Sequence, residues 1–345
     1  MLIVRPVTHN DLPALERLAI ICGGRLTTLP ANRDHLSSII SSTQRSLKQL
    51  NHEPGGESFH FVLENQATQE IIGVSGIEAV IGLKWPFYNY RISSVVHASP
   101  ELQIHNRIPA LHLCQDYAGS TRLCTLFIDP QYQREHHYQL LSKARLLFIN
   151  LALSRFAERT IVELQGVLDK EGKSPFWECL GKHFFSMDIA KAIYLVGINS
   201  NAFIATLMPQ YPVYAPLLSK EAQAILGKPR EDVTFNMELL KQEGFQHRGY
   251  MDIFDAGPTL EADTKKLKTI SNSQQCQPVI GERTSPEPSV DQWYLVSNQL
   301  QPQYRCMLIP FNPEQPVLSE AEASALLLSK GDHIQYSPVQ LSTPN

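Results

Sequence analysis

One stretch constrains the fold of this chain more than any other: a mostly apolar run from Leu123 to Ile128 that ends at Asp129-Pro130. A run without polar alternation is typical of a strand that is buried on both faces. Downstream, from about Tyr138 to Phe156, apolar residues recur at helical spacing on one face. The sequence therefore predicts a central strand, a short polar loop and an amphipathic helix, as in a mixed α/β fold.

The loop between this strand and helix, Gln131 to His137, carries Arg134, His136 and His137. The first N–H groups of a helix have no intrahelical partner and carry partial positive charge, so such a loop can bind an anion. An ordinary strand–loop–helix connection fits the same residues equally well. Two adjacent histidines with no third ligand in range predict no metal site.

Length and charge narrow the class of protein. The chain has 345 residues, enough for two domains, and its net charge of −4 lacks the basic footprint of a nucleic-acid-binding protein. No apolar run reaches about 18 residues, so we expect no membrane segment. The six cysteines are scattered without a Cys-x-x-Cys pair. This pattern is typical of reduced cysteines in a cytoplasmic protein and predicts no zinc site.

The elements expected before the central strand follow a definite order of strand, helix, helix and antiparallel hairpin, with further strands after it. Their ranges are 2–7 (strand), 12–22 and 34–51 (helices), 59–64 and 71–80 (hairpin), and 92–97 and 108–113 (strands). Together with the central strand, loop and helix, this order resembles the GNAT-like N-acyltransferase fold. In that fold the loop after the central strand cradles the pyrophosphate of coenzyme A.

The second half of the chain repeats one feature. A helix, a glycine and a phenylalanine follow one another around Gly181 and again around Gly244, each with a strand expected after it. Both glycines fit the left-handed position just past a helix end. The repeat predicts tandem acyltransferase-like halves over residues 1–160 and 161–273. We interpret residues 274–345 as a linker, rich in Gln, Ser and Pro up to Val290, and a small β-rich region that covers the second half.

Eight long and unusual segments carry a closer resemblance: Leu29–Asn32, Tyr88–Arg91, Val96–Ser99, Leu123–Pro130, Leu141–Arg145, Ser174–Asp188, Leu207–Pro209 and Asp252–Leu260. In these segments the chain resembles the arginine N-succinyltransferase family of the bacterial arginine succinyltransferase pathway. The arginine/ornithine succinyltransferase chains carry similar segments. The resemblance covers roughly residues 1–269 and is weaker beyond.

The resemblance implies transfer of succinyl from succinyl-CoA to the α-amino group of L-arginine, with ornithine as an alternative acceptor. The amine attacks the thioester directly, so neither a cysteine nucleophile nor a metal is required. The family residue that matches Leu126 contacts succinyl-CoA, and backbone amides there would polarise the thioester carbonyl. The side chain of Leu126 could equally be part of the core. The implied cofactor-binding residues are Leu126, Phe127, Ile128, Arg134, His136 and Tyr138.

Two places depart from the family's pattern. The loop has His136 and Tyr138 where active members tend to have glycines, which let the backbone approach phosphate, although Arg134 can still pair with phosphate. The family's proton-donor histidine matches Arg230, and an arginine stays charged at pH 7 and is a poor proton donor. We therefore expect Arg230 to lie beside the thioester and to orient a carboxylate or stabilise the oxyanion.

Five further residues in family-like strings are candidates for binding the substrate: Asn89, Arg91, His97, Asp252 and Asp255. Arg91 could hold the succinyl carboxylate in a bidentate pair or could brace the fold. Asp252 and Asp255 could accept the guanidinium of arginine or could cap local amides at a strand-to-turn step. His97 could touch the substrate or could be a buried, hydrogen-bonded histidine.

Three functions therefore remain open. The first is an active arginine N-succinyltransferase with weakened or relocated acid chemistry. The second is a non-catalytic or regulatory subunit that pairs with an active paralogue, and the third is an acyltransferase with a changed amine or acyl group. The substitutions at Arg230 and in the loop favour the second and third, whereas the intact substrate-side strings favour the first. We also expect an oligomer, with no nucleic-acid or membrane partner.

Overall fold

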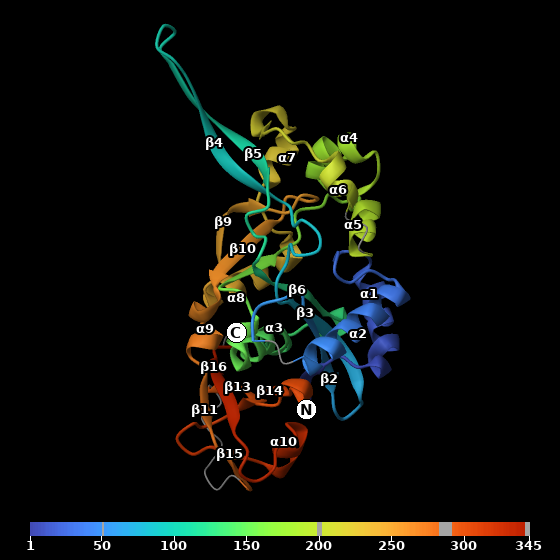
Figure 1. Cartoon of the computed structure of the whole chain (residues 1–345), viewed down its shortest axis with the longest axis vertical. Coiled ribbons are helices and arrows are strands. Elements are labelled where there is room, and N and C mark those ends of the chain that lie inside the picture. The colour runs from blue at the N-terminus through green and yellow to red at the C-terminus, as the bar shows by residue number, and fades with distance from the viewer. Residues whose placement is uncertain (50–51, 199–201, 283–291, 342–345) are drawn as a thin grey trace.

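The computed structural model describes residues 1–49, 52–198, 202–282 and 292–341 (Figure 1). One sheet of 14 strands runs through these residues in the order β11-β16-β13-β14-β1-β2-β3-β6-β7-β10-β9-β4-β5-β8, and β12 pairs with β15 separately. Helices lie along this sheet, and within the described ranges none of them is long and apolar enough to cross a membrane. The mixed α/β class predicted from the sequence is confirmed.

The first part of the chain has the predicted order of elements. β2 and β3 form the predicted antiparallel hairpin, and β6 pairs with β3 on one side and β7 on the other, so the predicted central strand lies inside the sheet. The elements are β1 (Leu2–Pro6), α1 (Leu12–Cys22), α2 (Arg33–Lys48), β2 (Ser58–Asn65), β3 (Glu70–Glu78), β6 (Thr121–Ile128), α3 (Glu135–Leu151) and β7 (Arg159–Glu163).

Two apolar cores hold the helices against this part of the sheet. On one face, Phe148 of α3 contacts Phe59 and Phe61 of β2, with ring centroids 5.0 Å apart in both pairs. Burying each such ring stabilises the fold by about 1.5–3 kcal/mol. A second core contains Leu15 of α1 and Val74 of β3 together with residues of α2. α3 is thereby fixed next to β6, which positions the site described below.

Strands from the second half of the chain extend the same sheet. β7 pairs with β10, β10 with β9, and β9 with β4. The sequence suggested separate strands for each half of the chain. The structure instead has one sheet that both halves share, and the predicted boundary between residues 160 and 161 falls within β7. The elements are α4 (Lys182–Phe185), α5 (Ile189–Gly197), α6 (Ala202–Leu207), α7 (Lys220–Ile225), α8 (Thr234–Glu243), β9 (Gln246–Met251), β10 (Pro258–Asp263) and α9 (Lys268–Ser271).

The repeat predicted from two glycine steps holds only at the second one. Gly244 has φ +120° and ends α8 before β9, as predicted. The prediction for Gly181 is wrong, because its φ is −58°, it lies inside a helical segment, and α5 follows where a strand was expected. A Cβ on Gly181 would lie 2.2 Å from the ring of Trp177. This glycine therefore permits close packing and does not end a helix.

A long hairpin of β4 (Asn89–Ser99) and β5 (Ile104–Cys114) projects from the body of the molecule (Figure 1). β4 pairs with β9 only at its first residues, and β5 pairs with β8 (Val213–Tyr214) only near its end. Near the tip, the described residues offer the hairpin no third strand, and the side chains of Val96, Leu102 and Ile104 are exposed.

The C-terminal region is rich in strands, as predicted, but it lies elsewhere than expected. β14 pairs with the outer edge of β1 at Val4 and Cys306, so the prediction that this region covers the second half is wrong. The stretch predicted as a linker contains β11 and β12, while residues 283–291 lie outside the described ranges. The elements are β11 (Gln274–Cys276), β12 (Val279–Ile280), β13 (Trp293–Asn298), β14 (Cys306–Pro310), β15 (Val317–Leu318), α10 (Glu320–Ala325) and β16 (Ile334–Val339).

Candidate active site

The site begins where β6 and β7 part. These parallel strands pair only from Thr121 to Leu123 on β6, after which the end of β7 pairs with β10 alone. On its other edge β6 has a bulge, because Thr125 and Leu126 together face one residue of β3, and Thr125 has φ +58°. A bulge re-aims the strand locally. The backbone of Thr125 and Leu126 thus has no strand partner in register on either edge.

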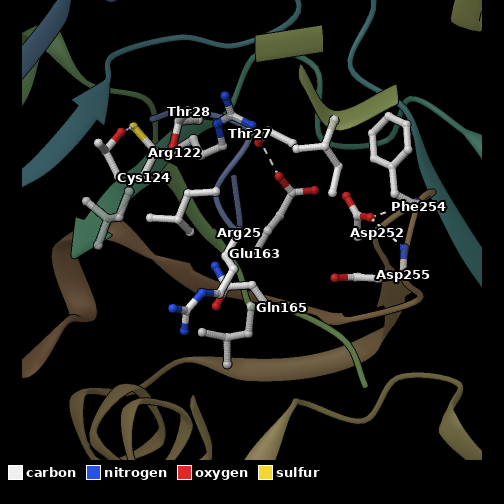
Figure 2. A pocket seen from close by; sticks show the side chains of 15 residues that line it. Arg25, Thr27, Thr28, Arg122, Cys124, Glu163, Gln165, Asp252, Phe254 and Asp255 are labelled. Atoms are coloured by element: carbon white, nitrogen blue, oxygen red, sulfur yellow. Dashed lines mark hydrogen bonds and ion pairs between the residues drawn. The ribbon is translucent and has the colours of Figure 1, made fainter. Parts of the chain in front are cut away.

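Three adjoining cavities surround this gap. The gap cavity, of about 80 Å³, lies between the strand ends (Figure 2). The helix-side cavity, of about 60 Å³, shares residues 123–125 and 163–165 with it and reaches Tyr138 and Ser142 of α3. The wide cavity, of about 410 Å³, shares Arg122, Glu163 and Asp252 with the gap cavity and reaches the aromatic segment 83–88. Adjoining cavities therefore lead from α3 through the strand gap to the aromatic segment.

A half-buried charged group forms the wall between the gap and wide cavities. Arg122 donates from Nε to Glu78 Oε2 (2.5 Å) and from Nη1 to Glu163 Oε2 (3.1 Å), and Asn89 Nδ2 donates to Glu163 Oε1 (3.2 Å). Burial alone would lower the pKa of Arg122, but Glu78 and Glu163 reverse this effect and raise it. Arg122 is therefore a fixed cation whose charge the two carboxylates already neutralise.

Asp252 and Asp255 lie on the opposite side of the gap cavity from Arg25 (Figure 2). Asp252 Oδ1 accepts hydrogen bonds from the backbone N–H groups of residues 254 and 255, and Asp255 accepts from those of Gly166 and Gly257. Burial first, and then Asp255 and Glu163, raise the pKa of Asp252 well above its usual range. Burial likewise raises the pKa of Asp255. A raised pKa at a cavity makes such a carboxyl a candidate for acid–base chemistry.

Two glycines allow the turn that carries Asp252 and Asp255 to pack closely against the end of β7. A Cβ on Gly257 would lie 2.1 Å from the carbonyl oxygen of Leu164, and one on Gly166 would lie 2.2 Å from the carbonyl oxygen of Asp255. Any other residue would push the turn away from the strand. The turn after β9 is thereby fixed beside the strand gap by backbone contact.

Arg145 of α3 lines the helix-side cavity and is only 2% exposed. Its Nη1 donates to the carbonyl oxygens of Cys124 (3.1 Å) and Gly76 (3.3 Å), the facing residues of β6 and β3 next to the bulge. Its Nε and Nη2 donate to the carbonyl and hydroxyl oxygens of Ser142. Burial lowers the pKa of Arg145 to about 10. Arg145 therefore stays protonated at pH 7, and its hydrogen-bond partners among the described residues are neutral oxygens.

Cys124 lines all three cavities and is the thiol nearest to the bulge. Burial, and then the charge of Glu78, raise the pKa of its thiol to about 11. A thiol with this pKa is almost entirely protonated at neutral pH and is a poor nucleophile. The arrangement therefore fits direct transfer better than an acyl-cysteine intermediate.

The predicted cofactor-binding residues fall into three groups. Leu126 and Tyr138 line the helix-side cavity. The side chains of Phe127 and Ile128 pack into the cores, so only their backbone could contact a ligand. Arg134 is the N-cap residue of α3, and His136 follows it with its ring against that of His137. Burial lowers the pKa of both histidines, which leaves Arg134 as the dependable positive charge of this loop.

The predicted substrate-binding residues lie partly at the cavities and partly outside them. Asp252 and Asp255 line the gap cavity, and both also cap local amides, which was the alternative for them. Asn89 is fully buried behind the wall and reaches the cavity only through Glu163. Arg91 and His97 lie outside the three cavities. Arg91 is exposed beside Asp116 and Tyr250, and His97 is exposed on the hairpin against Tyr214.

Arg230 lies next to the cavities without lining them. Its backbone N–H donates to the carbonyl oxygen of Gln165 (2.8 Å), and Gln165 lines both the gap and helix-side cavities. Its guanidinium is held by the two carboxylate oxygens of Asp232 at 2.5 and 2.9 Å. Its charge also helps to lower the pKa of Asp255, against the larger effect of burial.

Sequence reasoning missed Arg25, Arg122, Arg145 and Glu163 as site residues. Arg145 left a signal, because it falls four residues after Leu141 and three before Phe148 on the apolar stripe of its helix. An arginine on such a stripe must find polar partners inside the protein. Arg122 and Glu163 left none, because their pairing depends on how β6 and β7 lie side by side.

His60 lines the wide cavity and supports a prediction about pH. It is 5% exposed, and burial lowers its pKa to about 4, below the usual value of about 6.5. The unfolded chain therefore binds a proton that the folded chain does not, and folded stability is lost as pH falls from about 6.5 towards 4. We expect His60 to remove about 2–3 kcal/mol from the free energy of unfolding between pH 7 and 4.5.

The measurement is urea unfolding of the parent and of His60→Gln at both pH values. The drop in unfolding free energy between the two should be smaller in the variant by that amount. Other titrating groups cancel in this comparison. Equal drops would mean that His60 titrates normally and that its burial is not rigid.

The bulged central strand, the parting of its parallel neighbour and the cavities on both sides of the gap form one candidate site, and the matches to known proteins show the class of protein to be an acyltransferase. The family model described as arginine N-succinyltransferase beta subunit matches residues 2–269. The chain is 42% identical over 339 residues to the arginine N-succinyltransferases of Salmonella schwarzengrund and Salmonella agona, covering 97% of each chain. The chain belongs to the arginine N-succinyltransferase family.

A solved structure extends this match. The fold is similar to that of the arginine/ornithine succinyltransferase subunit AI from Pseudomonas aeruginosa, with a TM-score of 0.90 and 34% sequence identity over 99% of each chain. The similarity includes the C-terminal region beyond the family model. The sequence-based assignment to this family and to an acyltransferase activity is therefore confirmed.

Proposed function

We propose that this chain transfers succinyl from succinyl-CoA to the α-amino group of L-arginine. The observation that carries the proposal is the passage of adjoining cavities through the gap between β6 and β7. A donor on one side and an acceptor on the other can meet only at the gap. This arrangement brings the amine and thioester together without a covalent enzyme intermediate.

The donor side is assigned to the helix-side cavity. The pantetheine arm would lie between Leu126 and Tyr138, and the phosphates would lie at the N-terminus of α3, near Arg134 and His136. Support comes from the free backbone of the bulge, and from the 17 residues of α3, whose first N–H groups attract anions. Arg145 adds a fixed positive charge behind the bulge, where the thioester oxygen becomes negative during attack.

The acceptor side is assigned to the wide cavity. Its volume of about 410 Å³ is within the usual range of about 300–1,000 Å³ for small-molecule sites. Asp252 and Glu163 line it, and Asp255 lies next to them in the gap cavity. A molecule with a guanidinium and an ammonium group would be attracted to these carboxyls. The same features would admit ornithine, so the assay compares arginine with ornithine as the acceptor.

The reaction forms one bond and breaks one. The neutral α-amine attacks the thioester carbon, the tetrahedral intermediate collapses, and the C–S bond breaks to give the amide and coenzyme A. The amine loses a proton and the leaving thiolate gains one. We assign proton acceptance to the Asp252–Asp255 pair, because both carboxyls line the gap cavity and their pKa values are raised. Arg230 is assigned the role of orienting this carboxylate side through its charge.

The test combines binding and turnover of the purified chain. We expect calorimetry to detect succinyl-CoA binding that weakens with added salt, because its phosphate contacts are partly electrostatic. Release of free thiol should follow the addition of arginine, and the assay is repeated with ornithine. Absence of binding at low salt would remove the proposal. Binding with faster turnover of ornithine would retain the site and change the amine.

One observation favours a second candidate function, a subunit that depends on an active paralogue. The guanidinium of Arg230 is held by Asp232, and the first turn of α3 carries His136 and Tyr138 where glycines would let the backbone approach phosphate closely. The similar Pseudomonas protein is named as a subunit. Binding of coenzyme A without turnover by the chain alone would favour this function.

Assembly and location are also proposals. We infer that the chain forms an oligomer, supported by the projecting hairpin with exposed Val96, Leu102 and Ile104 and unpaired strand edges near its tip. We infer a cytoplasmic location, supported by six free cysteines.

A further inference from the structure

The donor proposed above ends in a free carboxylate, so its acyl group should meet a cation near the strand gap. Three arginines line the gap or helix-side cavities: Arg25, Arg122 and Arg145. Arg122 is already paired with Glu78 and Glu163, and Arg145 is fixed to backbone carbonyl oxygens behind the bulge. Arg25 differs from both, because its guanidinium is not paired with a carboxylate in the described part of the chain.

Arg25 is presented to the cavity by two glycines. Gly23 and Gly24 have φ +64° and +72°, and they turn the chain sharply at the end of α1. The Nε of Arg25 donates to the carbonyl oxygen of Cys22 (3.0 Å), which fixes the base of the guanidinium. Its two terminal nitrogens make no hydrogen bond or ion pair with any residue in the described ranges. The guanidinium therefore has a free face at the gap.

Neutral hydrogen-bond donors lie around this guanidinium. The side chains of Thr27, Thr28 and Gln165 line the same cavity, and none of them has a hydrogen-bond partner among the described residues. In Figure 2 the guanidinium of Arg25 lies beside Gln165, whereas Asp252 and Asp255 are on the other side of the pocket. The gap cavity thus has a cationic side with free donors and a separate acidic side.

We propose that Arg25, assisted by Gln165 and the threonine hydroxyls, binds the distal carboxylate of the acyl group and makes the chain selective for a dicarboxylic acyl-CoA. This inference rests on the proposed function. Leu26, the next residue, lines both the gap and helix-side cavities, so the segment lies where the acyl group would leave the donor side. A guanidinium can donate two parallel hydrogen bonds to a carboxylate.

The test is calorimetric binding of succinyl-CoA and butyryl-CoA, which have the same four-carbon chain and differ in the terminal carboxylate. We expect Arg25→Gln to weaken succinyl-CoA roughly 10- to 100-fold, as expected for the loss of a charged hydrogen bond, and to leave butyryl-CoA unchanged. The matched control is Arg33→Gln, an exposed arginine paired with Glu16 that lines none of the three cavities. It should leave the ratio of the two affinities unchanged.

Further measurements show whether Arg25 binds the carboxylate of the acyl group, the carboxylate of the acceptor or a phosphate of coenzyme A. If Arg25→Gln weakens arginine but not agmatine, and leaves the donor ratio unchanged, the residue binds the acceptor's carboxylate and the inference fails. If it weakens unacylated coenzyme A equally, it acts on coenzyme A itself and the inference also fails. Equal affinity of the parent for both esters overturns the inference while the proposed function stands. Absence of binding to any coenzyme A ester overturns both.

Discussion

Replacing Arg145 with methionine is expected to lower kcat with succinyl-CoA and arginine by roughly 100- to 1,000-fold, the range seen when one group that stabilises an oxyanion is removed. The guanidinium binds the carbonyl oxygens of Cys124 and Gly76, the facing residues of β6 and β3 next to the bulge, and its charge is not neutralised by a described carboxylate. Methionine has a similar length without charge or donors. The loss should therefore affect the transition state more than the binding of succinyl-CoA.

A split between kcat and KM distinguishes this role from a purely structural one. We expect kcat to fall while KM for succinyl-CoA changes less than about tenfold, because the ground state carries little charge at the thioester oxygen. Arg145→Lys should recover part of kcat by restoring charge without the planar fork.

The matched control is Arg155→Lys, a second arginine that is almost fully buried, lines none of the three cavities and is paired with Glu57 at the wide cavity. It should alter thermal stability and leave kcat within a few-fold of the parent. A parallel fall in kcat and binding for Arg145→Met, together with loss of the folded state, would show that Arg145 only braces the sheet.

The sequence predicted the central strand because its cause is local. An apolar run ended by Asp-Pro can be read without knowing its neighbours, and β6 occupies the interior of the sheet as expected. The helix after it was also predicted, although α3 begins at Glu135, three residues earlier than expected. Polar residues in the first turn hid this start, because helix ends carry a weaker signal than apolar stripes.

The cavities could not be predicted in the same way, because distant segments form them. Arg25 follows α1, Glu163 ends β7 and Asp252 follows β9, and these residues meet only after β6 and β7 part. Periodicity reports which face of an element is buried but not which element lies beside it. The family-like strings suggested Asp252 and Asp255, which line the gap cavity, but they also suggested Arg91 and His97, which lie outside the three cavities.

The chain lacks the histidine that its family resemblance places at position 230, and restoring it should have the other large effect. If Arg230 leaves the proton transfer slow, Arg230→His should raise kcat with arginine by roughly 100- to 10,000-fold, the usual contribution of a positioned acid or base. The backbone at this position is bonded to Gln165, which lines the gap, and Asp232 lies beside the side chain. A neighbouring carboxylate would favour the protonated imidazole and so its use as an acid.

The measurement is steady-state kinetics across pH for the parent, Arg230→His and the exposed Lys228→His, which places a histidine two residues away as a matched control. A gain confined to Arg230→His, with a new dependence on a group titrating near pH 6–7, would mark the parent as a weakened enzyme. Adding Tyr138→Gly should then improve succinyl-CoA binding, because it removes a bulky side chain from the first turn of α3. A fast parent that Arg230→His slows would place proton transfer elsewhere, at the Asp252–Asp255 pair, because that pair is the raised-pKa acid group in the gap. Coenzyme A binding without turnover in every variant would leave the subunit function as the better account, since the donor site would then be intact and the missing chemistry would have to come from another chain.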